Sequence, residues 1–151
     1  MSSKNIGYLA GVFDFCHKGH VNIIAKASNL CDQLIVAVVS DNFAFKYKKQ
    51  DIIHNEKERV EMIDSLNLGV DIVIVDNNNH NLFFDKYKIT DLFHGTDWDK
   101  ESYIDFMGRF DIESRNIKVH MLPHTKGISS TILRNLQIER KTINKTEEVI
   151  V

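Results

Sequence analysis

The chain has 151 residues, a hydrophobic fraction of 43%, a charged fraction of 26% and a formal net charge of −2 at pH 7. This length favours one domain, and such a chain buries about 70% of its unfolded surface without a metal or disulfide staple. The composition excludes a disordered, collagenous or coiled-coil chain. Near-neutral charge excludes a broad nucleic-acid-binding surface, so we expect no nucleic-acid partner and only local anion sites.

The cellular compartment is predicted from what the sequence lacks. No apolar run reaches the roughly 18 residues that a membrane span requires, and the N-terminus has no basic-then-apolar signal pattern. Cys16 and Cys31 form neither a CxxC pair nor a disulfide framework. We therefore expect reduced thiols, a cytoplasmic location and no membrane partner.

Short apolar runs alternate along the chain with segments of helical spacing. The runs predicted as strands are continuous rather than alternating, which is typical of strands covered on both faces. The predicted strands are 6–12, 33–40, 70–75, 91–94 and 117–122. The predicted helices are 21–30, 60–66, 82–87, 103–110 and, after a Ser/Thr-rich start, 129–136.

This alternation predicts an α/β fold, namely a Rossmann-like doubly wound parallel sheet of about five strands with helices on both faces. Right-handed crossovers would bring the loops that follow the strands to one edge of the sheet. The catalytic domain is expected at 1–139 and a C-terminal tail at 140–151. The basic and aromatic segment 43–54 is interpreted as a loop over the sheet edge.

The strongest functional signal is the segment 11–20, GVFDFCHKGH, which follows a predicted strand and opens a predicted helix. Gly11 permits a close turn, and Gly19 lets a ligand approach the backbone. A helix N-terminus offers free N–H groups and a partial positive charge to a phosphate. His17 and His20 could donate hydrogen bonds to a phosphorus centre that gains negative charge. The alternative for a single histidine in a turn is a solvated or structural role.

The segment 11–20 resembles the GxFDxxHxGH signature of the cytidylyltransferase-like nucleotidyltransferases (HxGH type). This family includes glycerol-3-phosphate, phosphocholine and phosphoethanolamine cytidylyltransferases. Residues 127–131, GISST, resemble the RTxGISTT-type motif of the cytidylyl branch, and residues 95–98, GTDW, resemble its GDDW motif. The motifs keep their order over about residues 6–136. The resemblance is greater to the small bacterial glycerol-3-phosphate enzymes than to the adenylyl branch.

The resemblance implies roles for individual residues. The catalytic residues would be His17 and His20, which stabilise the α-phosphoryl transition state, with Lys46, which clamps the reacting phosphates. Lys48 would act with Lys46 as a second charge clamp, and Lys49 is the alternative partner in this segment. The nucleotide would be bound by Gly11, Val12, Phe13, Asp14, Gly19, Lys48, Asp97, Trp98, His124, Thr125, Gly127, Ile128, Ser129, Ser130 and Thr131.

Several of these roles have structural alternatives. Asp14 could help to coordinate Mg²⁺ or could hold its loop. Trp98 is expected beside the cytosine, or else as a core or rim aromatic residue. The hydroxyls at 129–131 could bind phosphates or only cap a helix. Arg59 matches the arginine of the family's E-x-R helix start and is expected to bind substrate, with an exposed helix arginine as the alternative.

The sequence departs from the family pattern in three places. These departures leave the assignment of cytidylyl transfer standing, but they weaken the assignment of glycerol 3-phosphate as the acceptor. His124 stands where the last motif usually begins with arginine, and a histidine is only partly charged at neutral pH. Lys126 or Arg134 could compensate. The segment 64–70 lacks the arginine that glycerol-3-phosphate enzymes carry before the third strand, and 77–81 shows no obvious aromatic residue.

The predicted reaction is transfer of CMP from CTP to a small phosphorylated alcohol, giving a CDP-alcohol and pyrophosphate. The acceptor would be glycerol 3-phosphate or a related polyol or amino-alcohol phosphate, bound by loops at 77–84 and 97–109. Mg²⁺ would accompany the nucleotide without a separate protein metal site, and the resemblance implies a homodimer. The alternatives are an adenylyltransferase of the same superfamily and a catalytically inactive nucleotide-binding module.

Overall fold

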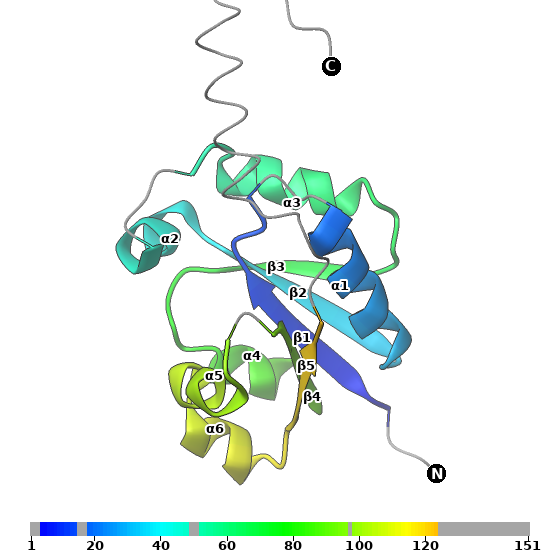
Figure 1. Ribbon diagram of the computed structural model, residues 1–151, viewed down its shortest axis with the longest axis vertical. Helices are drawn as coiled ribbons and strands as arrows, with labels where there is room; N and C mark the ends of the chain where they lie inside the picture. The colour runs from blue at the N-terminus through cyan, green and yellow to red at the C-terminus, as the bar shows by residue number, and fades with distance from the viewer. Residues whose placement is uncertain (1–3, 15–17, 49–51, 97, 124–151) are drawn as a thin grey trace, which may run out of the picture.

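The computed structural model describes residues 4–14, 18–48, 52–96 and 98–123. Within them, all strand pairs of one sheet are parallel, in the order β3-β2-β1-β4-β5 (Figure 1). The strands are β1 (Ile6–Gly11), β2 (Gln33–Val39), β3 (Asp71–Val75), β4 (Asp91–Gly95) and β5 (Lys118–Leu122). The predicted five-stranded parallel sheet is confirmed.

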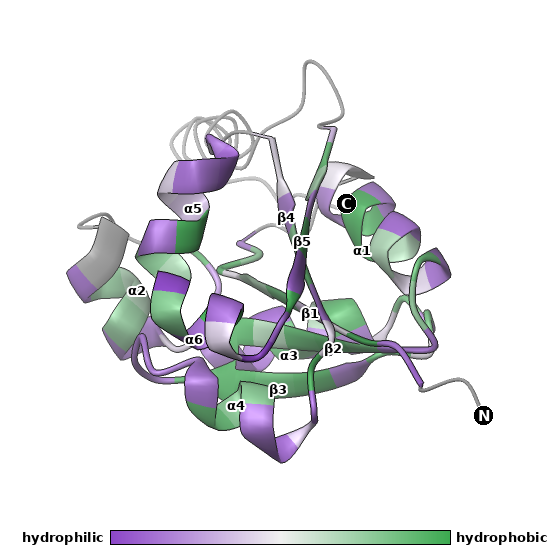
Figure 2. Cartoon of the chain, turned by 90° about the horizontal axis from the view of Figure 1, so that it is seen from below, coloured by the Kyte–Doolittle hydropathy of each residue, from purple (hydrophilic) through white to green (hydrophobic). Residues whose placement is uncertain are grey.

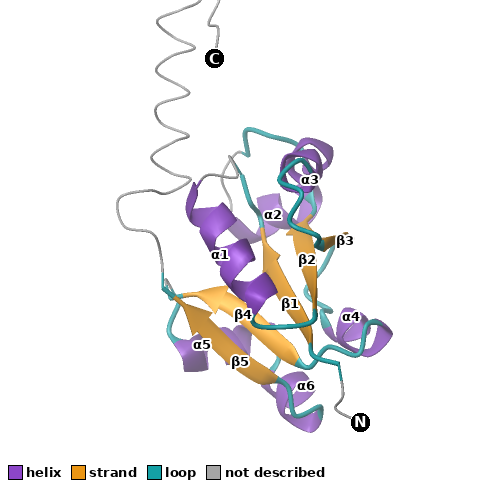
Figure 3. Ribbon diagram, turned by 90° about the vertical axis from the view of Figure 1, so that its right-hand side faces the viewer, coloured by secondary structure: helices purple, strands orange, loops and turns teal. Residues whose placement is uncertain are grey.

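Helices cover both faces of this sheet (Figures 1 and 3). One face carries α1 (Lys18–Asn29) and α3 (Glu56–Asp64), and the other carries α4 (Asn81–Lys86), α5 (Lys100–Met107) and α6 (Arg109–Ser114). The short α2 (Asp41–Lys48) follows β2. The predicted doubly wound Rossmann-like α/β fold is therefore confirmed.

The core consists of two apolar layers, one on each face of the sheet. Successive residues of β1 alternate between them: Tyr8 and Ala10 join the layer under α4–α6, whereas Leu9 joins the layer under α1 and α3. Strand β2 is apolar in every residue after Gln33, whereas the helices alternate between apolar and polar residues (Figure 2). This double burial is the physical reason for the continuous apolar runs.

The structure corrects two predicted elements. The supposed loop at 43–54 begins as helix α2, whose start is capped by the Ser40 hydroxyl accepting from the Phe43 N–H at 3.1 Å. The supposed helix at 103–110 is interrupted at Gly108, whose φ of 110° ends α5 and lets α6 begin in a new direction. The predicted helix at 129–136 and the tail at 140–151 lie outside the described residues.

No helix in the described ranges is both long enough and apolar enough to cross a membrane.

Candidate active site

The candidate site lies where the strand order reverses between β1 and β4. The connections that leave β1 and β4 run to opposite faces of the sheet, which opens a crevice beyond their carboxyl ends. Gly11 ends β1, and Gly95 ends β4. In open α/β sheets ligands bind at such a crevice. The fold thus brings the segment 11–14 to the position where a ligand site is expected.

The turn after β1 has a tightly folded backbone. Phe13 is buried with a φ of 57°, a left-handed conformation that is unfavourable for a residue with a side chain. A Cβ at Gly11 would lie 3.1 Å from the Phe13 ring, so glycine there leaves room for that ring. Val12 between them is buried and lines the crevice.

His20 lies in the first turn of α1, close to this turn. Its ring meets the Phe13 ring edge-on, with centroids 5.4 Å apart and planes at 73°. Gly19 is buried beside it. The first N–H groups of a helix lack intrahelical acceptors, so this end of α1 can accept an anion. Of the predicted histidine pair, the structure describes His20, and His17 lies outside the described residues.

Asp14 holds the chain segment that precedes α3. Its carboxylate, 2% exposed, accepts hydrogen bonds from the backbone N–H groups of Ile53 and His54, both at 3.1 Å. The His54 ring nitrogen Nδ1 lies 3.4 Å from the same carboxylate. This geometry is that of a loop-holding residue. Among the described residues, no three His, Cys, Asp or Glu side chains are arranged to hold a metal ion.

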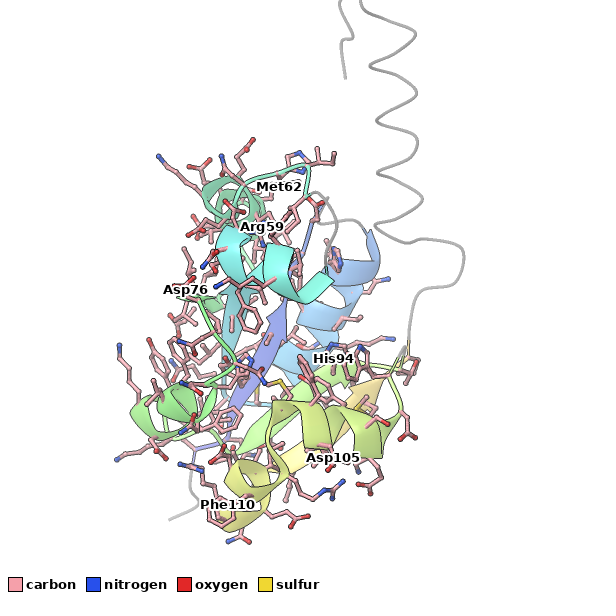
Figure 4. All side chains as sticks on the ribbon, turned by 90° about the vertical axis from the view of Figure 1, so that its left-hand side faces the viewer. Arg59, Met62, Asp76, His94, Asp105 and Phe110 are labelled. Carbon is pink, nitrogen blue, oxygen red and sulfur yellow. The ribbon has the colours of Figure 1, made fainter. Side chains whose placement is uncertain are left out.

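Arg59 corrects an interpretation from the sequence. It is fully buried rather than exposed, so its guanidinium is not open to a substrate. Nη1 donates to the carbonyls of Val12 at 2.8 Å and Val39 at 2.6 Å. Nε donates to the His54 carbonyl at 3.0 Å, and Nη2 donates to the Asp41 carboxylate at 2.7 Å. Arg59 therefore joins the carboxyl ends of β1 and β2 to α2 and α3 (Figure 4).

The predicted lysine clamp belongs to α2. Lys46 is exposed and lines a shallow depression together with Phe43, Asp76 and Phe106. Because α2 follows directly after β2, Lys46 lies at the same edge of the sheet as the turn after β1. The side chain of Lys48 lies outside the described residues, as does Lys49.

A pocket opens beside the turn at the carboxyl edge. It holds about 590 Å³ of empty space including its open mouth. Residues of β1 and the turn form its floor, and His80 and His94 contribute two imidazoles. An aromatic group completes the wall, formed by Phe43, Trp98, Tyr103 and Phe106. The two segments predicted to build the acceptor pocket, 77–84 and 97–109, thus both contribute to one pocket.

Trp98 belongs to the rim of this aromatic group. Its ring centroid lies 4.9 Å from Phe106 and 5.8 Å from Tyr103. His94 lies next to α5, with its ring centroid 4.3 Å from Tyr103 (Figure 4). The His94 Nδ1 lies 3.1 Å from the carbonyl oxygen of Gly95, which can only accept, so the proton is on Nδ1.

His80 and Tyr8 form a buried pair beneath the pocket. The His80 Nδ1 and the Tyr8 hydroxyl oxygen are 2.6 Å apart, and the side chains are 3% and 0% exposed. Burial lowers the pKa of His80 to about 4. Burial, with a smaller contribution from Tyr103, raises the pKa of Tyr8 well above its ordinary value. Both groups are therefore uncharged at pH 7.

The sequence did not single out His80, His94, Tyr103 or Phe106. Their position in the sequence could have indicated the two histidines: His94 lies at the carboxyl end of a strand, where ligands bind in such sheets, and His80 directly precedes a helix. The remaining predicted nucleotide-binding residues lie outside the described residues, so their roles stay predictions. They are Asp97, His124, Thr125, Gly127, Ile128, Ser129, Ser130 and Thr131.

Comparison with known proteins identifies the family. A family profile described as cytidylyltransferase-like matches residues 8–136. The chain belongs to this family. Over 126 residues it is 32% identical to the glycerol-3-phosphate cytidylyltransferase of Bacillus spizizenii, which covers 82% of this chain and 90% of that relative. The resemblance seen in the motifs, and membership of the nucleotidyltransferase superfamily, are thereby confirmed.

Two further matches are to part of a longer relative and to a solved structure with a similar fold. Over 129 residues the chain is 29% identical to the bifunctional protein HldE of Hyphomonas neptunium, covering 85% of this chain and 26% of that one. A lipopolysaccharide core biosynthesis protein from Thermoplasma volcanium superposes with a TM-score of 0.66 at 21% identity, over 83% of this chain and 100% of its own. That likeness supports the fold alone.

Proposed function

We propose that this cytidylyltransferase-like protein transfers CMP from CTP to a small phosphorylated alcohol. The observation that carries the proposal is the placement of His20 in the first turn of α1, against Phe13 and directly after β1. An α-phosphate at this turn would meet both the imidazole and the first N–H groups of the helix. The similarity to a glycerol-3-phosphate cytidylyltransferase over most of both chains supports the same reaction.

The proposed reaction is a single displacement at phosphorus. A phosphate oxygen of the acceptor forms a bond to the α-phosphorus of CTP, the bond to the bridging oxygen of the β-phosphate breaks, and pyrophosphate leaves. The acceptor phosphate is already largely ionised at pH 7, so no general base is required. Catalysis then rests on positioning and on stabilising the negative charge that develops.

Residues of this chain would divide these tasks. His17 and His20 donate hydrogen bonds to the oxygens of the reacting α-phosphoryl group. Lys46, on α2, and Lys48 attract the leaving pyrophosphate, and the segment 129–131 cradles it. Arg59 and Asp14 contribute indirectly, because they fix the turn after β1 and the segment before α3.

Magnesium stays a prediction that rests on the nucleotide, whose phosphate oxygens are ligands that the ion prefers. Bound there, Mg²⁺ neutralises part of the phosphate charge. Both oxygens of the Asp14 carboxylate accept backbone N–H groups, so the described geometry supports holding the segment before α3 rather than binding the ion. We therefore derive no step through the ion. The homodimer likewise stays a prediction.

The proposal is tested by measuring pyrophosphate release with CTP or ATP and a panel of acceptors. The panel contains glycerol 3-phosphate, phosphocholine and phosphoethanolamine. We expect release with CTP that depends on an acceptor. Release with ATP but not CTP would favour an adenylyltransferase. Binding of CTP without release across the panel would favour an inactive nucleotide-binding module.

A further inference from the structure

The pocket at the carboxyl edge is largely apolar, with a few polar groups and no charged side chain among its described lining residues. Its polar side chains include His80, His94 and Trp98, and no Asp, Glu, Lys or Arg is among the residues that line it in the described part of the chain. Lys46 lies in the neighbouring depression instead. A ligand whose phosphate is held outside the pocket would therefore place an uncharged part inside it.

The direction of the hydrogen bond between Tyr8 and His80 follows from burial. Tyr8 is fully buried, and His80 is the partner that the described structure gives its hydroxyl. A buried hydroxyl that donates to nothing is unfavourable. The Tyr8 O–H therefore donates to the His80 Nδ1, and a neutral imidazole then carries its proton on Nε2.

Among the described residues, only Tyr8 hydrogen-bonds to the His80 side chain, through Nδ1, which leaves Nε2 for a ligand. Tyr8 holds Nδ1 from beneath and is not itself a lining residue, whereas His80 lines the pocket. Although His80 directly precedes α4, its side chain makes no capping hydrogen bond to that helix. The ring is also restrained by an edge-on contact with Tyr8, with centroids 5.6 Å apart.

We propose that His80 presents its Nε2–H to the pocket as a neutral hydrogen-bond donor and binds a hydroxyl oxygen of the acceptor there. Tyr8 is the positioning residue, because its hydroxyl fixes the tautomer. The inference rests on the proposed cytidylyl transfer and narrows its substrate class to polyol phosphates. Phosphocholine and phosphoethanolamine carry no hydroxyl oxygen that this N–H could bind.

The kinetic test uses glycerol 3-phosphate as the probe. His80→Phe keeps an aromatic ring but removes the donor, and we expect it to raise the KM for glycerol 3-phosphate by about 10-fold with an unchanged KM for CTP. His80→Gln, which restores an N–H donor, recovers part of this loss. Tyr8→Phe raises the same KM by a smaller factor. An unchanged KM for glycerol 3-phosphate in active His80→Phe would overturn the proposal.

His120→Gln is the matched control. His120 also makes a short side-chain hydrogen bond, because its Nε2 lies 2.7 Å from the Asp91 carboxylate. It is not among the residues that line the pocket. We expect its KM for glycerol 3-phosphate to match the wild type. An equal rise in His120→Gln and His80→Phe would show that the effect is not specific to the pocket, and would also overturn the proposal.

The tautomer is tested without any activity. Nitrogen-15 NMR of the histidine rings in the free protein distinguishes a protonated from an unprotonated ring nitrogen, and His80→Phe assigns the signals. We expect the His80 proton on Nε2 in the wild type and a mixture of tautomers in Tyr8→Phe. A proton on Nδ1 in the wild type would overturn the inference, even if CTP transfer is observed.

The two proposals can also fail separately. If no acceptor yields pyrophosphate from CTP, the proposed function fails. Glycerol 3-phosphate binding is then followed by the fluorescence of Trp98, the chain's one tryptophan, which lines the pocket. Binding that His80→Phe weakens about 10-fold supports the His80 contact, and binding that the substitution leaves unchanged rejects it.

Discussion

Arg59 and Val12, 47 residues apart in the sequence, are joined by a 2.8 Å hydrogen bond from Nη1 to the backbone carbonyl. The same nitrogen donates to the carbonyl of Val39 at 2.6 Å. One guanidinium thus holds together the chain at the carboxyl ends of β1 and β2. The turn that carries the signature residues is fixed by a side chain that itself has no exposed surface.

Arg59→Lys tests this structural role. A lysine keeps the charge but cannot reproduce the planar fork that reaches three carbonyls and a carboxylate. We expect a loss of about 2 kcal/mol in the free energy of unfolding, measured by urea titration. Arg109→Lys is the control, since Arg109 pairs with carboxylates at the surface, and its unfolding midpoint should hardly move. Equal midpoints for Arg59→Lys and the wild type would contradict the role.

Asp14→Asn separates loop holding from metal binding. The amide retains one acceptor oxygen, so one of the two backbone N–H groups at 53 and 54 loses its partner. We expect unfolding at lower urea concentration and a lower turnover, with the Mg²⁺ concentration for half-maximal rate unchanged. A Mg²⁺ requirement raised by an order of magnitude or more would instead show that Asp14 binds the ion.

His80 makes the stability depend on pH. Its pKa is about 4 in the folded protein, below the ordinary value of about 6.5 that applies when unfolded. The unfolded state therefore binds the extra proton first, so the contribution is complete above pH 6.5 and is lost as the pH falls toward 4. At about 1.4 kcal/mol per unit, wild-type stability should fall by about 2 kcal/mol more than that of His80→Phe between pH 7 and 5.

The measurement is urea unfolding of wild type and His80→Phe at pH 7, 6 and 5. Using the difference between the two proteins removes the contributions of the other titrating groups. If the free energy of unfolding of the two proteins changes equally with pH over this range, folding does not lower the pKa of His80, and the prediction is wrong.

His20→Ala tests the catalytic assignment that the structure describes. Removing one donor to a developing phosphoryl charge should lower kcat by about 10²–10³-fold. The ring is half-buried and packs edge-on against Phe13, so the thermal unfolding midpoint should change little. His120→Gln again serves as the control and should retain wild-type turnover. Turnover near the wild-type value in His20→Ala would remove this histidine from the mechanism.

The inner strands were predictable because they are buried on both faces, which requires the continuous apolar runs seen in β1 and β2. Helix α2 was not predicted, because Phe43 and Ala44, which join an apolar cluster, are followed by basic residues that favoured a loop interpretation. The break between α5 and α6 depends on one backbone angle at Gly108, which no periodicity reveals.

The site was predictable where a motif carried it and less so where tertiary contacts build it. The turn at 11–14 and His20 followed from the signature, but the burial of Arg59 did not, because its partners Val12 and Val39 are distant in sequence. The pocket segments could be named, but not the aromatic contacts of Trp98 with α5, which arise only when the chain folds.

Cytidylyl transfer by this protein is tested most directly by phosphorus-31 NMR of the protein mixed with CTP, Mg²⁺ and glycerol 3-phosphate. We predict that pyrophosphate and a cytidine diphosphate ester of glycerol appear in equal amounts, and that His20→Ala forms both at least about 10²-fold more slowly. Failure to form any cytidine diphosphate ester with this acceptor or the rest of the panel, with CTP left intact, would contradict it.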